Sequence, residues 1–184
     1  MKIACLAWGS LVWDPRVLLI RRPWFNDGPF LPVEFCRQSQ DGRMTLVITP
    51  GKTPLRTLWA LSSVDNLREA IDNLGSREEI PTKNRKRDIG RWENASQPKD
   101  EIEEGIANWA NEKRIEAVIW TALPSKFNGQ NGSVPSVDAV VTYLKNLSFE
   151  KRHNAETYVR KAPIQIDTDY RRKIQTELGW EPQE

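Results

Sequence analysis

Apolar and polar positions follow two different spacings along the 184-residue chain, and these predict a protein of both strands and helices. Short apolar or β-branched runs, several with alternating polar positions, predict strands. These runs lie at residues 3–8, 33–39, 44–49, 56–61 and 116–123. The Asp-Gly pair at 41–42 separates the second run from the third, which favours a β-hairpin there.

The other spacing, of three to four residues, predicts helices. The first has apolar positions on one face at Leu67, Ala70, Ile71 and Leu74. Ser63 or Asp65 would cap its start, and Gly75 would mark its end.

Two further helices are expected over 100–112, with acids in the first turn, and after Ser136, which would cap the start. Residues 76–98 have no clean period and predict an irregular, polar excursion. Residues 124–135 are rich in Gly, Asn and Pro and predict a loop. The chain from residue 150 onward is charged and predicts helical pieces that end near Gly179.

The resulting order is strand, hairpin, strand, helix, helix, strand and helices. It lacks the regular alternation of a doubly wound sheet and predicts an α+β protein with a small mixed or largely antiparallel sheet or barrel and flanking helices. The length suits one domain, and no repeat or linker divides residues 1–184.

Composition narrows the functional classes. The net charge is only +2, which argues against a dedicated nucleic-acid partner, and the basic run at 83–87 is soon followed by the acidic run at 100–104. No apolar run reaches the roughly 18 residues of a membrane span, and no signal peptide is recognisable, so we expect a cytoplasmic protein without a membrane partner. Cys5 and Cys36 lie in strand-like runs and predict buried thiols. The eight tryptophans predict core or pocket walls.

A glycine and a serine interrupt the apolar segment at 4–15. After a strand, Gly9-Ser10 would allow a turn with positive φ, or a close approach of another group to the main chain. Such a turn exposes backbone N–H groups that can bind a carboxylate or an oxyanion. The alternative is a plain structural turn, which spacing alone favours.

Acidic residues are the better candidates for chemistry. His153 lies in a charged helical stretch and predicts a surface residue, and Ser10 lacks the context of a nucleophilic serine. Glu78 and Glu79 follow directly after a predicted amphipathic helix. A carboxylate held at the edge of a core suits proton transfer near neutral pH, although two solvated glutamates are the simpler reading.

Three segments in order resemble the γ-glutamylcyclotransferase superfamily, closest to its ChaC-like, glutathione-specific branch. They are WGSLVWDP at 8–15, FCRQSQDGRMTLVITPG at 35–51 and LWALSSVDNLREAIDNLGSREE at 58–79. The resemblance covers roughly the first 80 residues. Trp8 stands where that family most often has tyrosine, and the family's Gly-x-Tyr continuation after its glutamate is not visible.

The resemblance implies a single γ-glutamylcyclotransferase-like domain and a substrate loop at Trp8, Gly9, Ser10 and Leu11. It implies that Glu78 is the catalytic acid and base, with Glu79 as the alternative. The reaction it implies is intramolecular aminolysis of a γ-glutamyl compound, which releases 5-oxoproline and needs no metal or organic cofactor.

Two other functions stay open at this point. One is a non-catalytic protein that binds a small metabolite or a peptide end on the same fold. The other is nucleic-acid contact through residues 83–87 and Trp92. The γ-glutamyl substrate and the oligomeric state are not determined by the sequence.

Overall fold

The computed structural model describes residues 1–183 and has the predicted α+β class, with mixed helices and strands. Its contacts divide the chain into two compact units, each built from three segments. The first unit comprises Met1–Ala7, Asp14–Leu31 and Arg56–Leu123. The second comprises Trp8–Trp13, Pro32–Leu55 and Pro124–Glu184. That these units form one γ-glutamylcyclotransferase-like domain stays a prediction.

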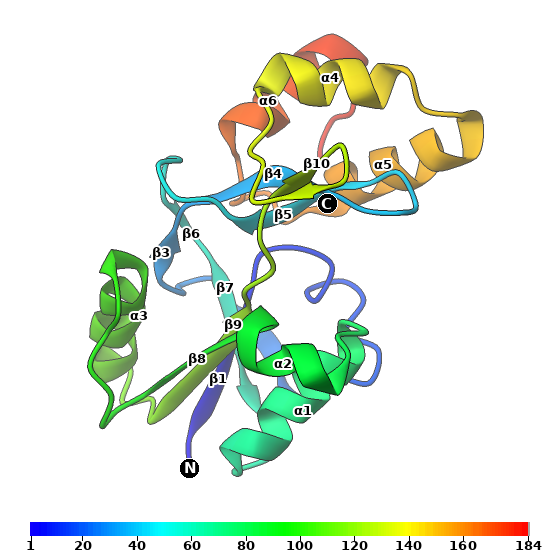
Figure 1. Ribbon diagram of the computed structural model, residues 1–184. Coiled ribbons are helices and arrows are strands. Elements are labelled where there is room, and N and C mark those ends of the chain that lie inside the picture. The colour runs from blue at the N-terminus through cyan, green and yellow to red at the C-terminus, as the bar shows by residue number, and fades with distance from the viewer. Residues whose placement is uncertain (184) are drawn as a thin grey trace. The chain divides into compact units, whose positions relative to one another are not determined.

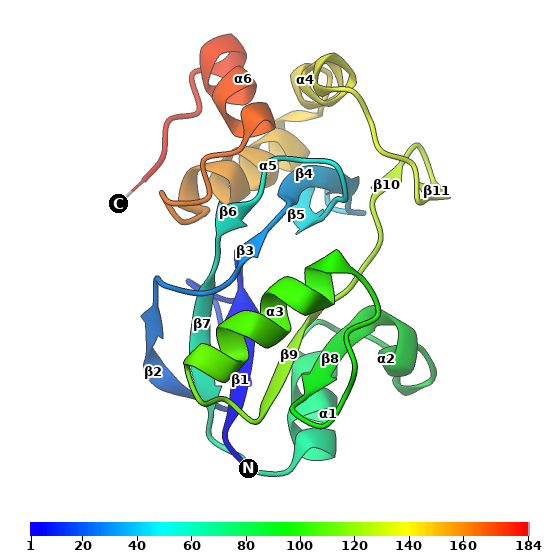
Figure 2. The same ribbon diagram turned by 90° about the vertical axis from the view of Figure 1, so that its left-hand side faces the viewer.

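The first unit is built on a five-stranded sheet (Figures 1 and 2). Its order is β2 (Ile20–Phe25), β7 (Leu58–Ser62), β1 (Ile3–Ala7), β9 (Ala117–Thr121) and β8 (Ile89–Glu93). The central strand β1 runs antiparallel to β7 and parallel to β9, and all five of its residues are buried. The sheet is therefore mixed, and no barrel closes among residues 1–183.

Helices cover both faces of this sheet (Figures 1 and 2). Helix α3 (Glu101–Glu112) packs on one face, and α1 (Leu67–Arg77) and α2 (Thr82–Asp88) lie on the other. Helix α3 has the predicted position, and Asp100 caps its start by accepting a hydrogen bond from the Glu103 N–H.

Helix α1 forms where predicted but has different ends. Its N-cap is Asn66 rather than Ser63 or Asp65, because the Asn66 side chain accepts the Glu69 N–H. The helix also continues through Gly75 to Arg77. Gly75 serves packing instead, since a Cβ there would come within 2.5 Å of Arg85 Nε. The prediction that Gly75 ends the helix is wrong.

The prediction of an irregular excursion over 76–98 is also wrong, because this range contains α2 and β8. Helix α2 has no buried apolar residue, and Arg85 fastens it by donating to the Ile80 carbonyl and to Asp72. Strand β8 pairs antiparallel with β9 at the edge of the sheet. Trp92 on this strand is buried, so it offers no aromatic surface for nucleic-acid contact.

The second unit has a four-stranded sheet in the order β11 (Gln130–Asn131), β10 (Lys126–Phe127), β4 (Val33–Gln38) and β5 (Met44–Ile48). Strands β4 and β5 form the predicted hairpin. The expected loop at 124–135 contains β10 and β11, which are only two residues each. Two other short strands, β3 (Phe30–Leu31) and β6 (Leu55–Arg56), pair in a separate sheet.

Three helices complete the second unit: α4 (Val137–Lys145), α5 (Phe149–Lys161) and α6 (Asp169–Leu178). Ser136 caps α4 as predicted, by accepting the Ala139 N–H. Gly179 ends α6 in the left-handed conformation, with φ of 69°. His153 is exposed on α5, as predicted.

The predicted buried thiols are confirmed, because Cys5 and Cys36 are both free and buried. Six of the eight tryptophans are also buried, as expected for core residues: Trp8, Trp59, Trp92, Trp109, Trp120 and Trp180. None of the helices within residues 1–183 has the length and apolar character needed to span a membrane.

Candidate functional site

The predicted substrate loop begins at Trp8, directly after β1, and forms a tight turn in the second unit. The Val12 N–H donates to the Gly9 carbonyl at 3.0 Å and closes the turn. The backbone N–H groups of Gly9 and Leu11 have no acceptor among the residues that the structure describes. The turn therefore offers donors that an anionic group can use.

Gly9 is required by a close approach rather than by its own dihedral angles, because its φ is not in the left-handed region. A Cβ on Gly9 would come within 2.6 Å of the Tyr158 hydroxyl oxygen, on α5. The same oxygen accepts the Leu46 N–H at 3.3 Å. The hydroxyl of a buried tyrosine is thus placed against the backbone of the predicted substrate loop.

Trp8 faces the interior of the second unit and is 4% exposed. Its indole N–H donates to the Leu46 carbonyl at 3.1 Å. The only polar atom of this side chain is therefore hydrogen-bonded within the protein. Trp8 supports the loop by packing in the interior of the second unit.

Aromatic and charged side chains surround Tyr158. The Trp13 ring meets it edge-on, with 5.4 Å between ring centroids, and Phe35 meets it edge-on from β4. The Arg43 guanidinium lies 5.4 Å from the centre of the Tyr158 ring and pairs with Asp41 at 2.7 Å. These contacts restrict the position of the tyrosine ring.

The predicted catalytic acid belongs to the first unit. Glu78 is the C-cap of α1, and its N–H donates to the Leu74 carbonyl at 3.0 Å. Its carboxylate pairs with Arg77 at 2.7 Å, and the side chains of the acid and the arginine are 18% and 3% exposed. Glu78 is thus held at the edge of the core, as proposed from its position after a helix.

Glu79 has a different environment. Its φ of 57° puts it in the left-handed conformation, in the place where a glycine often ends a helix. Its side chain is 77% exposed and pairs with Arg16 at 2.9 Å. Because a solvated carboxylate is poorly fixed, Glu78 is the better of the two candidates.

Arg77 links the acid to neighbouring chain segments within the first unit. Its guanidinium also donates to the carbonyl of Asp14, three residues after the last residue of the predicted loop. The charge of Glu78 acts on Cys5 of β1, the strand that precedes the loop. Burial raises the pKa of the Cys5 thiol to about 12, and Glu78 adds to this effect.

The five predicted site residues are divided between the units. Trp8, Gly9, Ser10 and Leu11 belong to the second unit, and Glu78 belongs to the first. The loop follows β1 directly, and Val12 and Trp13 separate it from Asp14, the residue bound by Arg77.

Two further candidate site residues, Tyr158 and Glu34, were not predicted from the sequence. Tyr158 lies in a charged helical stretch that gave no signal. Glu34 is an acid within an apolar strand, and this position indicates a buried carboxyl group. Its side chain is only 2% exposed. Its carboxylate accepts the Phe35 N–H at 2.8 Å and the Tyr170 N–H at 3.3 Å. Burial raises the pKa of this carboxyl group.

Glu34 lines a small hollow of about 70 Å³ in the second unit, next to the start of α6. This volume admits only very small molecules. Within residues 1–183, no group of three or more His, Cys, Asp or Glu side chains is arranged to hold a metal ion.

Comparison of the chain with family models, curated proteins and solved structures gives no match.

Proposed function

We propose that this protein is a γ-glutamylcyclotransferase-type enzyme that releases 5-oxoproline from a γ-glutamyl compound. The observation that carries the proposal is the difference between two adjacent glutamates. Glu78 is fixed by the buried Arg77, whereas Glu79 is solvated. Arg77 also binds the carbonyl of Asp14, three residues after the predicted substrate loop. The three sequence segments that resemble this superfamily support the same conclusion.

In the proposed reaction the nucleophile belongs to the substrate. Its α-amino nitrogen forms a bond to the side-chain carbonyl carbon, and the amide C–N bond breaks. Glu78 takes a proton from the α-ammonium group and returns it to the leaving nitrogen. The products are 5-oxoproline and a free amine, amino acid or peptide, so no nucleophilic serine is needed and Ser10 is not given that role.

The substrate loop would supply hydrogen-bond donors. We assign backbone N–H groups of Gly9, Ser10 and Leu11 to the oxyanion and the α-carboxylate of the substrate. Holding the substrate folded for internal attack lowers the barrier further, by about 7 kcal/mol in favourable cases. Trp8 contributes the shape of the loop, because its N–H is bound to Leu46.

A matched pair of variants tests the assignment. Glu78→Gln is expected to reduce the rate by at least about a hundredfold, the usual contribution of a positioned acid–base group. Glu79→Gln changes the adjacent, exposed acid in the same way and is expected to stay within about twofold of the unchanged protein. Both variants should remain folded, because glutamine keeps the size of glutamate. Glu78→Gln is expected to melt at a lower temperature than Glu79→Gln, because it removes the charge that pairs with the buried Arg77.

The assay measures 5-oxoproline directly, with glutathione, a γ-glutamyl amino acid and a γ-glutamyl amine as substrates. Full activity of Glu78→Gln would contradict the role of Glu78. Absence of 5-oxoproline from all three compounds would contradict the enzymatic proposal. If one of them nevertheless binds, the alternative function of a non-catalytic metabolite-binding protein replaces it.

A further inference from the structure

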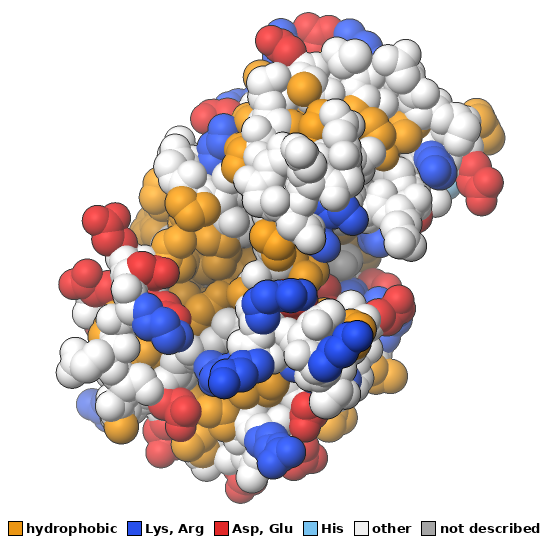
Figure 3. Space-filling model, viewed as in Figure 1, with side chains coloured by type: hydrophobic (Ala, Val, Ile, Leu, Met, Phe, Trp, Pro, Cys, Tyr) orange, Lys and Arg blue, Asp and Glu red, His pale blue; other side chains and the backbone are white. Residues whose placement is uncertain are grey.

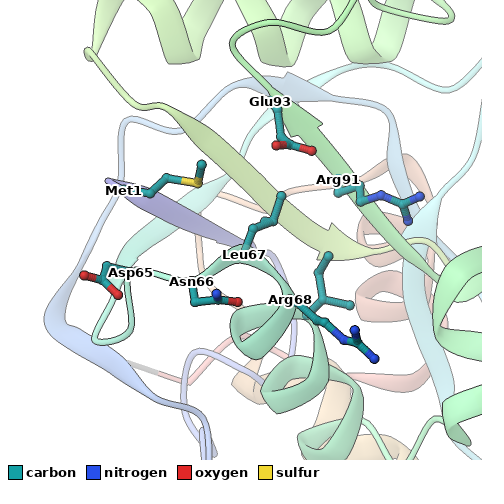
Figure 4. Close-up of a pocket in the computed structure, with 8 residues that line it drawn as sticks. Met1, Asp65, Asn66, Leu67, Arg68, Arg91 and Glu93 are labelled. Carbon is teal, nitrogen blue, oxygen red and sulfur yellow. The ribbon is translucent and has the colours of Figure 1, made fainter.

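A depression in the first unit lies apart from the residues assigned to catalysis, between the start of α1 and strand β8 (Figure 4). Its volume of about 470 Å³ lies within the range of small-molecule sites, about 300–1,000 Å³. Its walls are formed by Met1, Asp65, Asn66, Leu67, Arg68, Ile71, Arg91 and Glu93.

Four of these side chains are charged, two positively and two negatively: Arg68, Arg91, Asp65 and Glu93. Within residues 1–183 none of the four takes part in an ion pair or a side-chain hydrogen bond. Opposite charges that line one depression without pairing must stand more than 4 Å apart. A ligand can therefore reach each of them without breaking an existing interaction.

The two arginines lie on the same side of the depression. Arg68 and Arg91 extend toward one side, Asp65 lies on the opposite side, and Glu93 lies on the same strand as Arg91 (Figure 4). Arg68 comes from α1 and Arg91 from β8, so two elements bring two guanidinium groups to the same place. Like charges in one depression repel each other, and a carboxylate bound between them removes this repulsion.

The remaining wall is largely apolar. Leu67 and Ile71 are half-buried, on the side of α1 that faces the depression, and Met1 is 49% exposed beside them. An apolar side chain that covers these residues gains about 25 cal/mol for each Å² removed from water.

We propose that this depression binds an amino-acid-like zwitterion with an apolar side chain. Arg68 and Arg91 bind its carboxylate, Glu93 binds its ammonium group, and Leu67 and Ile71 contact its side chain. Polyanions are disfavoured because two acids line the same site. Acidic side chains also lie around the basic ones on this face of the first unit (Figure 3). The proposal is independent of the enzymatic function and concerns a second, non-catalytic site.

The test is titration of the full chain with L-leucine, followed by amide chemical shifts and by calorimetry. We expect saturable shifts centred on Leu67, Arg68 and Arg91. Arg91→Gln and Arg68→Gln should each weaken binding by about tenfold or more, the effect of one charge-assisted hydrogen bond. Arg22→Gln is the control, because it removes an exposed arginine from β2, at the other edge of the sheet.

Two analogues separate the two charges. N-acetyl-L-leucine lacks the ammonium group and isoamylamine lacks the carboxylate, and each is expected to bind at least tenfold more weakly than L-leucine. The proposal would be overturned if either analogue bound as tightly as L-leucine, if both arginine variants kept the affinity of the unchanged protein, or if L-leucine caused no saturable shifts.

Discussion

Trp8 and Tyr158 bind the two backbone polar groups of the same residue, Leu46. The Trp8 indole donates to the Leu46 carbonyl, and the Leu46 N–H donates to the Tyr158 hydroxyl. Leu46 lies on β5, an edge strand of its sheet. The loop and α5 therefore provide hydrogen-bond partners for an edge that would otherwise be open. This arrangement places the tyrosine hydroxyl where only a glycine fits at position 9.

This geometry predicts coupling between Gly9 and Tyr158. Gly9→Ala should destabilise the protein by about 1–3 kcal/mol, because its new methyl group overlaps the hydroxyl oxygen. Tyr158→Phe should cost about 1–3 kcal/mol, because it leaves the buried Leu46 N–H without that acceptor. The double variant should cost less than the sum, since removal of the hydroxyl leaves only an ordinary 3.5 Å contact to the ring.

Urea denaturation of the unchanged protein, the two single variants and the double variant measures the coupling between Gly9 and Tyr158. Gly105→Ala is the control, because a Cβ at this position in α3 meets open space. It should stabilise the protein by about 0.5–1 kcal/mol. Strict additivity of Gly9→Ala and Tyr158→Phe would show that the two residues do not interact.

Replacing Arg77 or Arg16 by methionine is expected to change the stability of the protein by different amounts. Arg77→Met should destabilise by about 2–3 kcal/mol, because this buried side chain binds the Glu78 carboxylate and the Asp14 carbonyl. Arg16→Met removes an ion pair between exposed side chains and one hydrogen bond to the Arg77 carbonyl, and should cost about 0–1 kcal/mol. Chemical denaturation measures the free energy of unfolding of both variants. Equal decreases would contradict a structural role for the contacts of Arg77 with Glu78 and Asp14.

Glu34 predicts a decrease in stability as the pH rises. Burial raises the pKa of this carboxyl group in the folded protein. The folded state therefore keeps its proton at pH values where the unfolded chain has lost it, and folding becomes less favourable from about pH 4.5 upward through the raised pKa. Glu34→Gln removes this dependence.

The measurement is the difference in unfolding free energy between the unchanged protein and Glu34→Gln, from urea denaturation at pH 4 to 8. The contributions of all other groups cancel in this difference. The unchanged protein should lose stability relative to the variant across this range. A constant or opposite difference would contradict the assigned direction.

Both cysteines are predicted to be unreactive in the folded protein. Burial is the main reason that the pKa is about 12 for Cys5 and about 11 for Cys36. At pH 8 only about one Cys5 thiol in ten thousand is ionised, and the thiolate is the reactive form. Ellman's reagent should label neither thiol within minutes in buffer and both in guanidinium chloride. Rapid labelling of the folded protein would show that a thiol is accessible.

The elements that the sequence predicted well are those whose own side chains form the core. Strand β1 and the β4–β5 hairpin follow their apolar runs, and Ser136 and Gly179 mark helix ends by local chemistry. Strand β2 was not predicted. It contains Pro23, which weakens a strand pattern and is tolerated at the edge of a sheet.

The failures have tertiary causes. A glycine at the end of an apolar helix pattern usually marks the helix end. Gly75 instead leaves room for the Arg85 side chain, which lies ten residues further along the chain and could not be foreseen from the local sequence. Helix α2 has no apolar face, so no period could predict it. For the candidate site, the position of Glu78 after a helix indicated a partly buried acid. Tyr158 could not be found, because its role depends on contact with Gly9, about 150 residues away in sequence.

The division of each unit into three chain segments affects synthesis on the ribosome. Strand β1 is made well before its parallel partner β9, which begins only at Ala117. Until then a wholly apolar strand lacks one of its two neighbours in the sheet. The nascent chain therefore carries an aggregation-prone segment until β9 has been made, which makes chaperone access during synthesis important for its yield.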